Sequence, residues 1–312
     1  MKLYLCFYFL VNFKAMTKSA LFVFILIISL FSCKQNLTNQ LDKLDEQNND
    51  TVDSVQLVKV WETDTLLTTA ESVIFDEKRN VYFVSCINGV SPWVNDGDGF
   101  IAKLDLNGNI LDRFWATGLS GPKGMAIKGD SLYVNDIDSL VTIDISTGKI
   151  LGKMTVGDAL HLNDMTLAED GDLFVSDSND GVIYKIAGDK ASVLLQDTTA
   201  GGINGLFVHE DIMVFVRPGS GMLYTIQHGN LTPVNVADGL HGGDGIEKYK
   251  SGFFVSNWQG SLFYLDSLWQ KTELLNSVDE KINIADIEVV EGQNLLLVPT
   301  FFDNRVVAYR IR

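Results

Sequence analysis

The chain has 312 residues, enough to bury a large core, and its formal net charge is −16. An acidic balance of this size argues against nucleic acid as a partner, whereas a cation-binding site and a simply soluble surface both fit it. Cys86 is the only cysteine beyond residue 33, so no disulfide can form within the folded part, which must be held together by packing.

The N-terminus has the layout of a secretory signal peptide. Lys18 precedes a mostly apolar run at 20–31, and the ending LFSC places a small residue directly before Cys33. This ending resembles the lipobox of bacterial lipoproteins, in which cleavage occurs before the cysteine and the cysteine carries the lipid. We expect residues 1–32 to be the signal peptide, with Met16 as the possible true start. An uncleaved membrane anchor is the alternative, but the run is short for a span of ~20 residues.

Residues 33–54 follow as a lipidated Cys33 and a tether. Positions 34–54 are polar and contain no aromatic residue, a composition typical of a flexible linker. We therefore expect a monomeric protein anchored to the bacterial cell envelope by its lipid, facing either the periplasm or the cell surface.

From Val55 onward the chain consists of short β-type runs bounded by Gly, Asn and Asp, and no window of helical period competes with them. The clearest runs are VYFVS (81–85), SLYVND (131–136), DLFVSD (172–177), GFFVSN (252–257) and LLLVPT (295–300). Runs of this kind predict an all-β domain over residues 55–312.

These runs belong to an internal repeat. Six similar segments start with a polar residue next to a small one, and the successive spacings are 52, 40, 41, 40 and 42 residues. The aligned polar residues are Glu71, Lys123, Asn163, Asn204, Asp244 and Asp286. The first spacing is longer because INGVSPWVNDGDG is inserted at 87–99. A period near 40 with four strands per unit predicts a six-bladed β-propeller.

The two ends of the domain indicate how the propeller closes. The last repeat stops after its third strand at RVVAYRIR (305–312), and VQLVKVWE (55–62) precedes the first repeat. We expect the N-terminal strand to complete the last blade, which leaves no open sheet edge in the ring.

In a propeller the first strand of each blade lines the central channel, so the six aligned residues should form a ring at one mouth. Their glycine neighbours are expected where backbones converge. Converging carboxylates repel one another unless a cation joins them. Oxygen ligands without Cys or His on the ring favour Ca²⁺, with Mg²⁺ or another divalent cation possible. The alternative is that Lys123 neutralises the acids and water fills the channel.

The motifs AESVIFD, GINGL and GDGI resemble the metal-binding set of the SMP-30/gluconolactonase family. That resemblance covers residues 55–312 and implies Glu71, Asn204 and Asp244 as metal ligands. It also implies that Asn163, in HLND, faces the substrate. His161 stands where the family usually has an Arg.

Further substrate-binding candidates surround the ring. Lys123 and Asp286 add charges to it, and His161 flanks it. Loops that follow second strands emerge on the same face, which brings Arg217 and the long insertion with Trp93 to the mouth. An enlarged loop in this place is a candidate lid.

Two functions remain open at this point. One is a metal-dependent hydrolase of a lactone or related ester, in which Asp244 acts as base and Lys123 or Arg217 stabilises the oxyanion. The other is a non-catalytic propeller that binds a small molecule or a protein. The chain has no Gly-x-Ser-x-Gly nucleophile motif, and fold alone does not choose between the two roles.

Overall fold

The computed structural model describes residues 55–197, 201–227 and 230–312. The predicted signal peptide, the lipidated Cys33 and the tether lie outside the described residues. Within these ranges, no helix has the length and apolar character needed to cross a bilayer.

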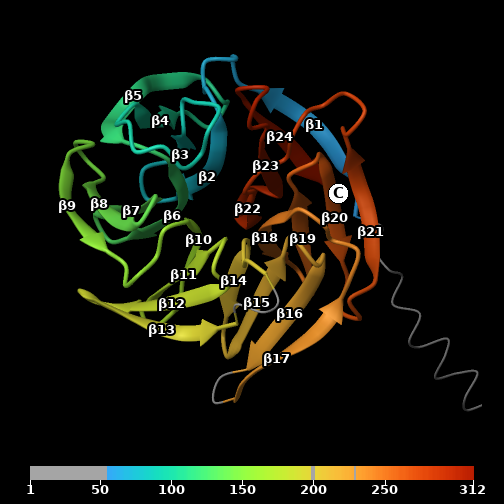
Figure 1. Cartoon of the computed structure of the whole chain (residues 1–312). Coiled ribbons are helices and arrows are strands. Elements are labelled where there is room, and N and C mark those ends of the chain that lie inside the picture. Colours follow the sequence, from blue (N-terminus) through green and yellow to red (C-terminus); the bar gives the residue numbers. More distant parts are fainter. Residues whose placement is uncertain (1–54, 198–200, 228–229) are drawn as a thin grey trace, which may run out of the picture. The chain divides into compact units, whose positions relative to one another are not determined.

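The described residues form six four-stranded antiparallel sheets arranged as the blades of a β-propeller (Figure 1). The six-bladed architecture predicted from the repeats is confirmed. The only helical element described is a short 3-10 turn at Glu291–Gln293.

The strands of each blade follow in chain order from the channel outward. Blade 1 contains β2 (Ala70–Asp76), β3 (Val81–Cys86), β4 (Gly99–Leu104) and β5 (Ile110–Leu119). Blade 2 contains β6 (Pro122–Lys128), β7 (Ser131–Asp136), β8 (Ser139–Asp144) and β9 (Ile150–Thr155). Blade 3 contains β10 (Leu162–Leu167), β11 (Leu173–Asp177), β12 (Val182–Ala187) and β13 (Lys190–Gln196).

The second half of the propeller repeats this order. Blade 4 contains β14 (Leu206–His209), β15 (Ile212–Arg217), β16 (Met222–Gln227) and β17 (Asn230–Ala237). Blade 5 contains β18 (Gly243–Tyr249), β19 (Gly252–Asn257), β20 (Ser261–Leu265) and β21 (Lys271–Asn276). Blade 6 contains β22 (Glu288–Val290), β23 (Leu295–Pro299), β24 (Val306–Ile311) and β1 (Leu57–Glu62).

The N-terminal strand closes the ring as expected. β1 pairs antiparallel with β24 from Leu57 opposite Ile311 to Glu62 opposite Val307, and Figure 1 shows the blue strand beside the red one. Because the two ends of the domain share one sheet, the ring cannot open without breaking a full strand ladder.

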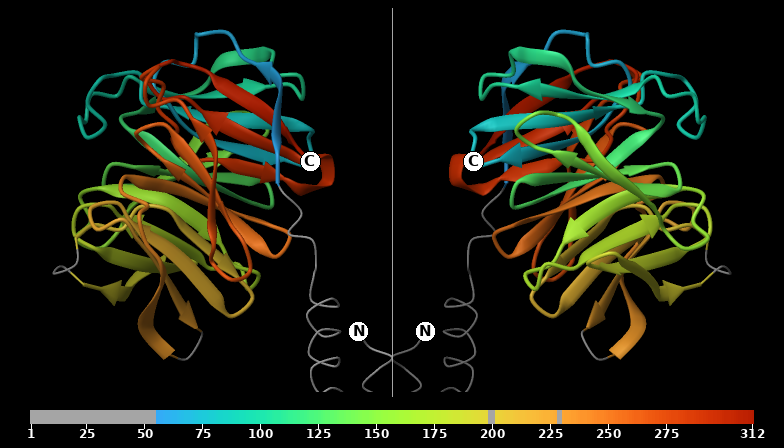
Figure 2. Two further views of the ribbon diagram at one scale, coloured as in Figure 1. Left: turned by 90° about the vertical axis from the view of Figure 1, so that its right-hand side faces the viewer. Right: turned by 90° about the vertical axis from the view of Figure 1, so that its left-hand side faces the viewer.

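Apolar packing between neighbouring blades forms the core. One cluster joins Tyr82 and Phe100 of blade 1 to Leu297 and Val306 of blade 6, and Cys86 is fully buried in it. Burial and a raised pKa make this thiol an inert core group. The 87–99 insertion, by contrast, projects from one face of the propeller (Figure 2).

Candidate functional site

Most of the first strands begin with a β-bulge. The pairing register shifts between Ala70 and Ser72 in blade 1, and between Gly243 and Ile246 in blade 5. A serine hydroxyl from the second strand accepts the freed backbone N–H, as Ser256 does for Gly245 at 2.8 Å. A bulge turns successive side chains toward the channel, which positions polar residues at the blade starts.

The glycines beside the ring positions are required by close approach. A Cβ on Gly245 would lie 2.5 Å from Oδ1 of Asp286, and a Cβ on Gly124 would lie 2.8 Å from the carbonyl oxygen of Asn163. Each of these glycines therefore faces the ring residue of the next blade. The expectation that backbones converge at the repeated motif is confirmed.

Glu71, Asn204 and Asp244 come from blades 1, 4 and 5, and we call them the mouth set. The Asn204 side-chain amide donates to Oδ1 of Asp244 at 2.8 Å. Glu71 is 4% exposed, and Asp244 lies close enough to raise the pKa of Glu71 through repulsion. Oε2 of Glu71 and Oδ1 of Asn204 are both buried without a hydrogen-bond partner within the described residues.

Burial dominates the electrostatics of the mouth set. It raises the pKa of Glu71 well above the ordinary value, opposed by Lys123. Burial, with added repulsion from Asp286, raises the pKa of Asp244 to about 8. The mouth therefore favours protons or cations over free carboxylates at neutral pH.

Lys123 lies under the 87–99 insertion. Its Nζ donates to the carbonyl oxygens of Pro92 at 2.8 Å and Gly121 at 2.9 Å, and it sits 4.0 Å from the ring centroid of Trp93. The lysine is 2% exposed, and burial lowers its pKa to about 8. In this arrangement Lys123 offsets the charge of the buried acids beneath the insertion, and its predicted contact with a substrate stays a prediction.

Trp93 also contacts the next blade. Its ring meets His161 edge-on, with centroids 4.8 Å apart, and Nδ1 of His161 is buried without a hydrogen-bond partner in the part of the chain described. The insertion thus rests on blades 2 and 3. His161 lies under Trp93 with one unpaired ring nitrogen, and its predicted contact with a substrate stays a prediction.

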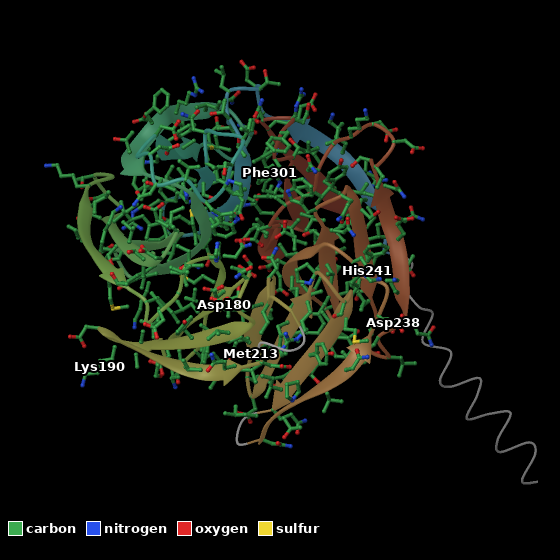
Figure 3. All side chains as sticks on the ribbon, viewed as in Figure 1. Asp180, Lys190, Met213, Asp238, His241 and Phe301 are labelled. Carbon is green, nitrogen blue, oxygen red and sulfur yellow. The ribbon has the colours of Figure 1, made fainter. Side chains whose placement is uncertain are left out.

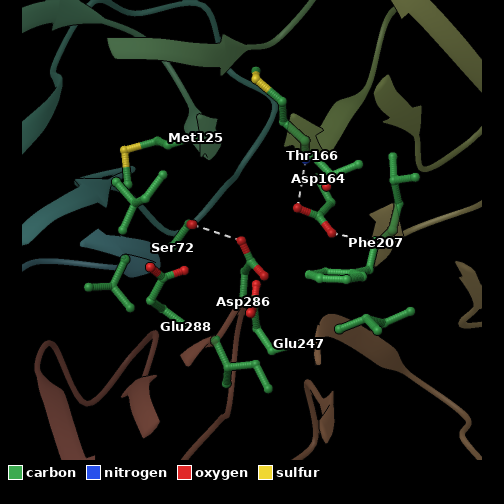
Figure 4. Close-up of a pocket in the computed structure, with 14 residues that line it drawn as sticks. Ser72, Met125, Asp164, Thr166, Phe207, Glu247, Asp286 and Glu288 are labelled. Atoms are coloured by element: carbon green, nitrogen blue, oxygen red, sulfur yellow. Dashed lines mark hydrogen bonds between the residues drawn. The ribbon is translucent and has the colours of Figure 1, made fainter. Parts of the chain in front are cut away.

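Four carboxylates line the channel further along the strands, and we call them the inner set. They are Asp164, Glu247, Asp286 and Glu288, and they surround a cavity of about 30 Å³ (Figure 4). A volume of this size holds roughly one or two water molecules. Of these four residues, only Asp286 was predicted from the sequence as a site residue, and it lines this cavity.

The inner carboxylates all receive hydrogen bonds from the protein. Asp164 accepts the backbone N–H groups of Met165 and Leu206, each at 2.6 Å. Asp286 accepts the Ser72 hydroxyl at 2.7 Å, and Glu288 accepts the backbone N–H of Phe75 at 3.1 Å. Glu247 accepts from the backbone of Val289. These bonds join neighbouring blades, so the inner set is part of the framework.

Burial nevertheless keeps the inner set hard to ionise. It raises the pKa of Asp286 to about 7 and that of Glu288 to about 8. Burial, joined by repulsion from neighbouring acids, also raises the pKa values of Asp164 and Glu247 well above their ordinary values. The surroundings of the inner set therefore favour the protonated forms of these acids.

The remaining predicted residues have separate positions. Asn163 is buried beside the mouth, and its side-chain amide has no hydrogen bond within the described residues. Arg217 is 1% exposed and donates to the carbonyl oxygen of Gly201 at 2.6 Å and to Oδ2 of Asp197 at 3.2 Å. Arg217 thus ties the end of β15 to Asp197 and Gly201, and its predicted contact with a substrate stays a prediction.

Among the described residues, no group of three or more His, Cys, Asp or Glu side chains is arranged to hold a metal ion. The mouth set supplies two such carboxylates and adds an amide oxygen. Glu71 Oε2 and Asn204 Oδ1 accept no hydrogen bond from the described residues. The chemistry of this site therefore depends on which ligand contacts these two oxygen atoms.

Two of the inner acids, Glu288 and Glu247, can be related to predicted ring residues once the strand register is known. Glu288 is two positions beyond Asp286, and side chains two apart on a strand face the same way. Glu247 is three positions beyond Asp244 because of the intervening bulge. A bulge cannot be read from one sequence, which is why this acid escaped the repeat alignment.

Comparison with known proteins supports the fold. No known family matches the chain, and no curated protein matches it. Among solved structures, a catalytically inactive virginiamycin B lyase from Staphylococcus aureus with quinupristin superimposes with a TM-score of 0.57 at 14% identity, covering 82% of this chain and 99% of that one. A selenomethionine-substituted form of the lyase gives 0.57 at 13% identity, over 82% and 99% of the two chains.

A nidogen/laminin complex gives a TM-score of 0.55 at 17% identity, covering 67% of this chain and 80% of that one. These neighbours share the six-bladed propeller with this chain. At such identities the likeness concerns the fold. It includes an enzyme and a protein-binding assembly, so it leaves the choice of function to the site itself.

Proposed function

We propose that the protein is a metal-dependent hydrolase of a lactone or related ester, on the propeller of an envelope-anchored lipoprotein. The observation that carries the proposal is the pair of buried oxygen atoms, Glu71 Oε2 and Asn204 Oδ1, that have no donor within the described residues. Leaving a buried acceptor unsatisfied costs about 1–3 kcal/mol. Glu71, Asn204 and Asp244 would hold a cation there, and its binding would offset that cost.

The mouth set fits a hard divalent ion. Carboxylate and amide oxygens are the ligands that Ca²⁺ prefers, and Mg²⁺ uses one or two carboxylates with water. With only two carboxylates and one amide in the set, water or substrate has to complete the coordination shell. The SMP-30/gluconolactonase resemblance of the three motifs points to the same residues.

A divalent ion held there would polarise the ester carbonyl and lower the pKa of a bound water. Residues of the chain would supply the base and the groups that orient the substrate. A bound cation would favour the ionised form of Asp244, which would accept the proton as the water oxygen adds to the carbonyl carbon; the alkoxide released when the acyl C–O bond breaks would then take that proton. Asn163, whose amide is not engaged, and Nδ1 of His161 orient the substrate.

The alternative is a non-catalytic propeller that binds a small molecule or a protein. Two observations favour it. The described residues offer no three-acid metal set, and both cationic candidates for oxyanion stabilisation, Lys123 and Arg217, are buried and engaged by backbone carbonyls. A binding role needs neither group.

A substrate panel separates the two functions. Purified residues 34–312 should hydrolyse at least one lactone or aryl ester, lose that activity in EDTA and regain it with Ca²⁺ or Mg²⁺. Asp244→Ala should abolish the activity, whereas Asp279→Ala, at an exposed acid on the surface, should leave it intact. Activity that survives both EDTA and Asp244→Ala would overturn the metal mechanism, and a protein inert on the whole panel would favour the binding role.

The envelope location has its own test. Cys33→Ala in the full-length chain should shift the protein from the membrane fraction to the soluble fraction or retain an uncleaved precursor. Cys33→Ala protein that has lost residues 1–32 and still stays in the membrane fraction would contradict anchoring by a lipid at Cys33.

A further inference from the structure

Three aromatic side chains gather on the face of the propeller that carries the mouth. We call Trp258, Phe301 and Phe302 the aromatic platform. Their ring centroids lie 4.7–6.1 Å apart, with interplanar angles of 78–80°. Trp258 is 38% exposed and Phe302 is 45% exposed, while Phe301 is buried beneath them. Exposed aromatic surface gathered in one place is typical of a binding site.

Strand pairing places the platform beside the mouth set. The backbone N–H of Trp258 donates to the carbonyl oxygen of Gly242 at 2.8 Å, two residues before Asp244. The backbone N–H of Phe301 donates to the carbonyl oxygen of Ala70 at 3.1 Å, one residue before Glu71. Figure 3 labels Phe301 where blades 6 and 1 meet. The platform thus lies next to two of the three proposed metal ligands.

The platform is held in place by its backbone. Phe301 has φ of 47°, a left-handed conformation that a bulky residue adopts only under constraint. The bond to Ala70 holds it there, and its own carbonyl oxygen accepts the N–H of Asn304 at 3.0 Å. The carbonyl oxygen of Trp258 accepts the Asn283 amide at 2.8 Å. Strain of this kind is retained mainly where the conformation has a use.

Another exposed aromatic shows the contrast. Phe114, on the outer strand of blade 1, packs edge-on against Phe100 with centroids 4.8 Å apart. The guanidinium of Arg113 covers its ring at 4.7 Å. Phe114 is thus a partnered surface residue far along the sheet from the channel, which makes it a suitable control.

We propose that the aromatic platform binds an uncharged ring of the ligand that enters the mouth. The negative face of an aromatic ring attracts the C–H edge of another aromatic ring or the C–H face of a sugar ring. A charged group placed on this platform would lose hydration without gaining a paired charge, which favours an uncharged ring. The proposed function adds that this ring belongs to a lactone or to the acyl or alcohol part of an ester.

The kinetic test uses the full-length protein in phospholipid nanodiscs with phenyl and linear alkyl esters of matched carbon number and a six-membered sugar lactone. Trp258→Ala and Phe302→Ala should each raise KM for the phenyl ester or the lactone about tenfold. We expect kcat to change little, and KM for the linear ester to stay within twofold. Trp258→Phe should restore most of the loss, and Phe114→Ala should change nothing.

A binding test keeps the inference separate from catalysis. Titration calorimetry with phenylacetamide, a methyl pyranoside and a linear amide, none of which is cleaved by an esterase, measures ring preference directly. Parent protein that binds a ring ligand at least tenfold more tightly than the linear amide, with Trp258→Ala removing the difference, supports the platform even if no hydrolysis exists. Phenylacetamide and the pyranoside distinguish an aryl ring from a sugar ring.

Two results would overturn the inference. One is equal binding of ring and linear ligands by the parent protein. The other is a ring preference that Trp258→Ala and Phe302→Ala both leave intact while the variants keep the parent's melting temperature. Either result leaves the proposed hydrolase untouched, because that depends on the mouth set.

Discussion

The mouth set and the inner set use the same kinds of side chain, yet their surroundings differ. Each inner carboxylate accepts a hydrogen bond from a backbone N–H or a hydroxyl, often from the next blade. In the mouth set, Glu71 Oε2 and Asn204 Oδ1 have no such donor among the described residues. The hydrogen-bond partners, and not the residue types, therefore separate the acids that link neighbouring blades from the mouth set, which has two unpaired oxygen atoms.

The largest expected effect tests whether the inner set stabilises the fold. Asp164→Ala leaves two buried N–H groups without an acceptor and should lower the free energy of unfolding by about 3 kcal/mol. Asp164→Asn should lose less, because the amide oxygen still accepts one of them. Urea denaturation measures both variants. In the metal-free protein Glu71→Gln should change the free energy of unfolding by less than ~1 kcal/mol. Equal losses in Asp164→Ala and Glu71→Gln would contradict the difference between the inner set and the mouth set.

The next effect tests whether the mouth set binds a cation. Calcium at a hundredfold excess over its Kd should stabilise the parent protein by ~2.7 kcal/mol, because it binds the folded state. The melting temperature measured with and without Ca²⁺ reports this gain. Asp244→Ala should abolish it, while Glu288→Gln in the inner set should retain it. A calcium shift that persists in Asp244→Ala and disappears in Glu288→Gln would exchange the roles of the two sets.

A smaller effect concerns pH. Burial raises the pKa of Glu288 to about 8 from an ordinary value of 4.5, so the folded state favours the protonated form. The corresponding stabilisation is complete below pH 4.5 and is lost as pH rises through about 8. In EDTA, Glu288→Gln should remove on the order of 1 kcal/mol of the decline in unfolding free energy between pH 5 and 8. A slope identical to that of the parent would contradict this assignment.

The smallest effect lies at the insertion. Trp93→Ala uncovers Lys123 and removes a cation–π contact of 4.0 Å, which should cost about 0.5–1 kcal/mol of stability. Proteolysis within 87–99 should also become faster, since the loop loses its hold on blades 2 and 3. Trp269→Phe, which keeps an aromatic ring stacked on Phe253, is the matched control. Unchanged proteolysis in Trp93→Ala would show that other contacts hold the loop.

Much of the fold was predictable because the blades of a propeller recur at a regular spacing along the sequence. The near-40-residue spacing identified six blades, and the incomplete last repeat identified β1 as the closing strand. The six ring positions were also predictable, since one polar residue recurs at each blade start, whereas the choice of Glu71, Asn204 and Asp244 among them came from the family resemblance. The inner acids were not, because Glu247 reaches the channel only through a bulge in β18.

The sequence by itself determined the strand content, the blade number and which polar residues start each blade, because these depend on local periodicity and glycine spacing. The tertiary structure decided which of those residues are free to act. Arg217 was expected at the mouth because it follows a second strand, and its guanidinium donates to Gly201 and Asp197. Lys123 is covered by a loop thirty residues earlier in the chain. Burial and hydrogen-bond partners arise only when distant segments meet, and no local pattern encodes them.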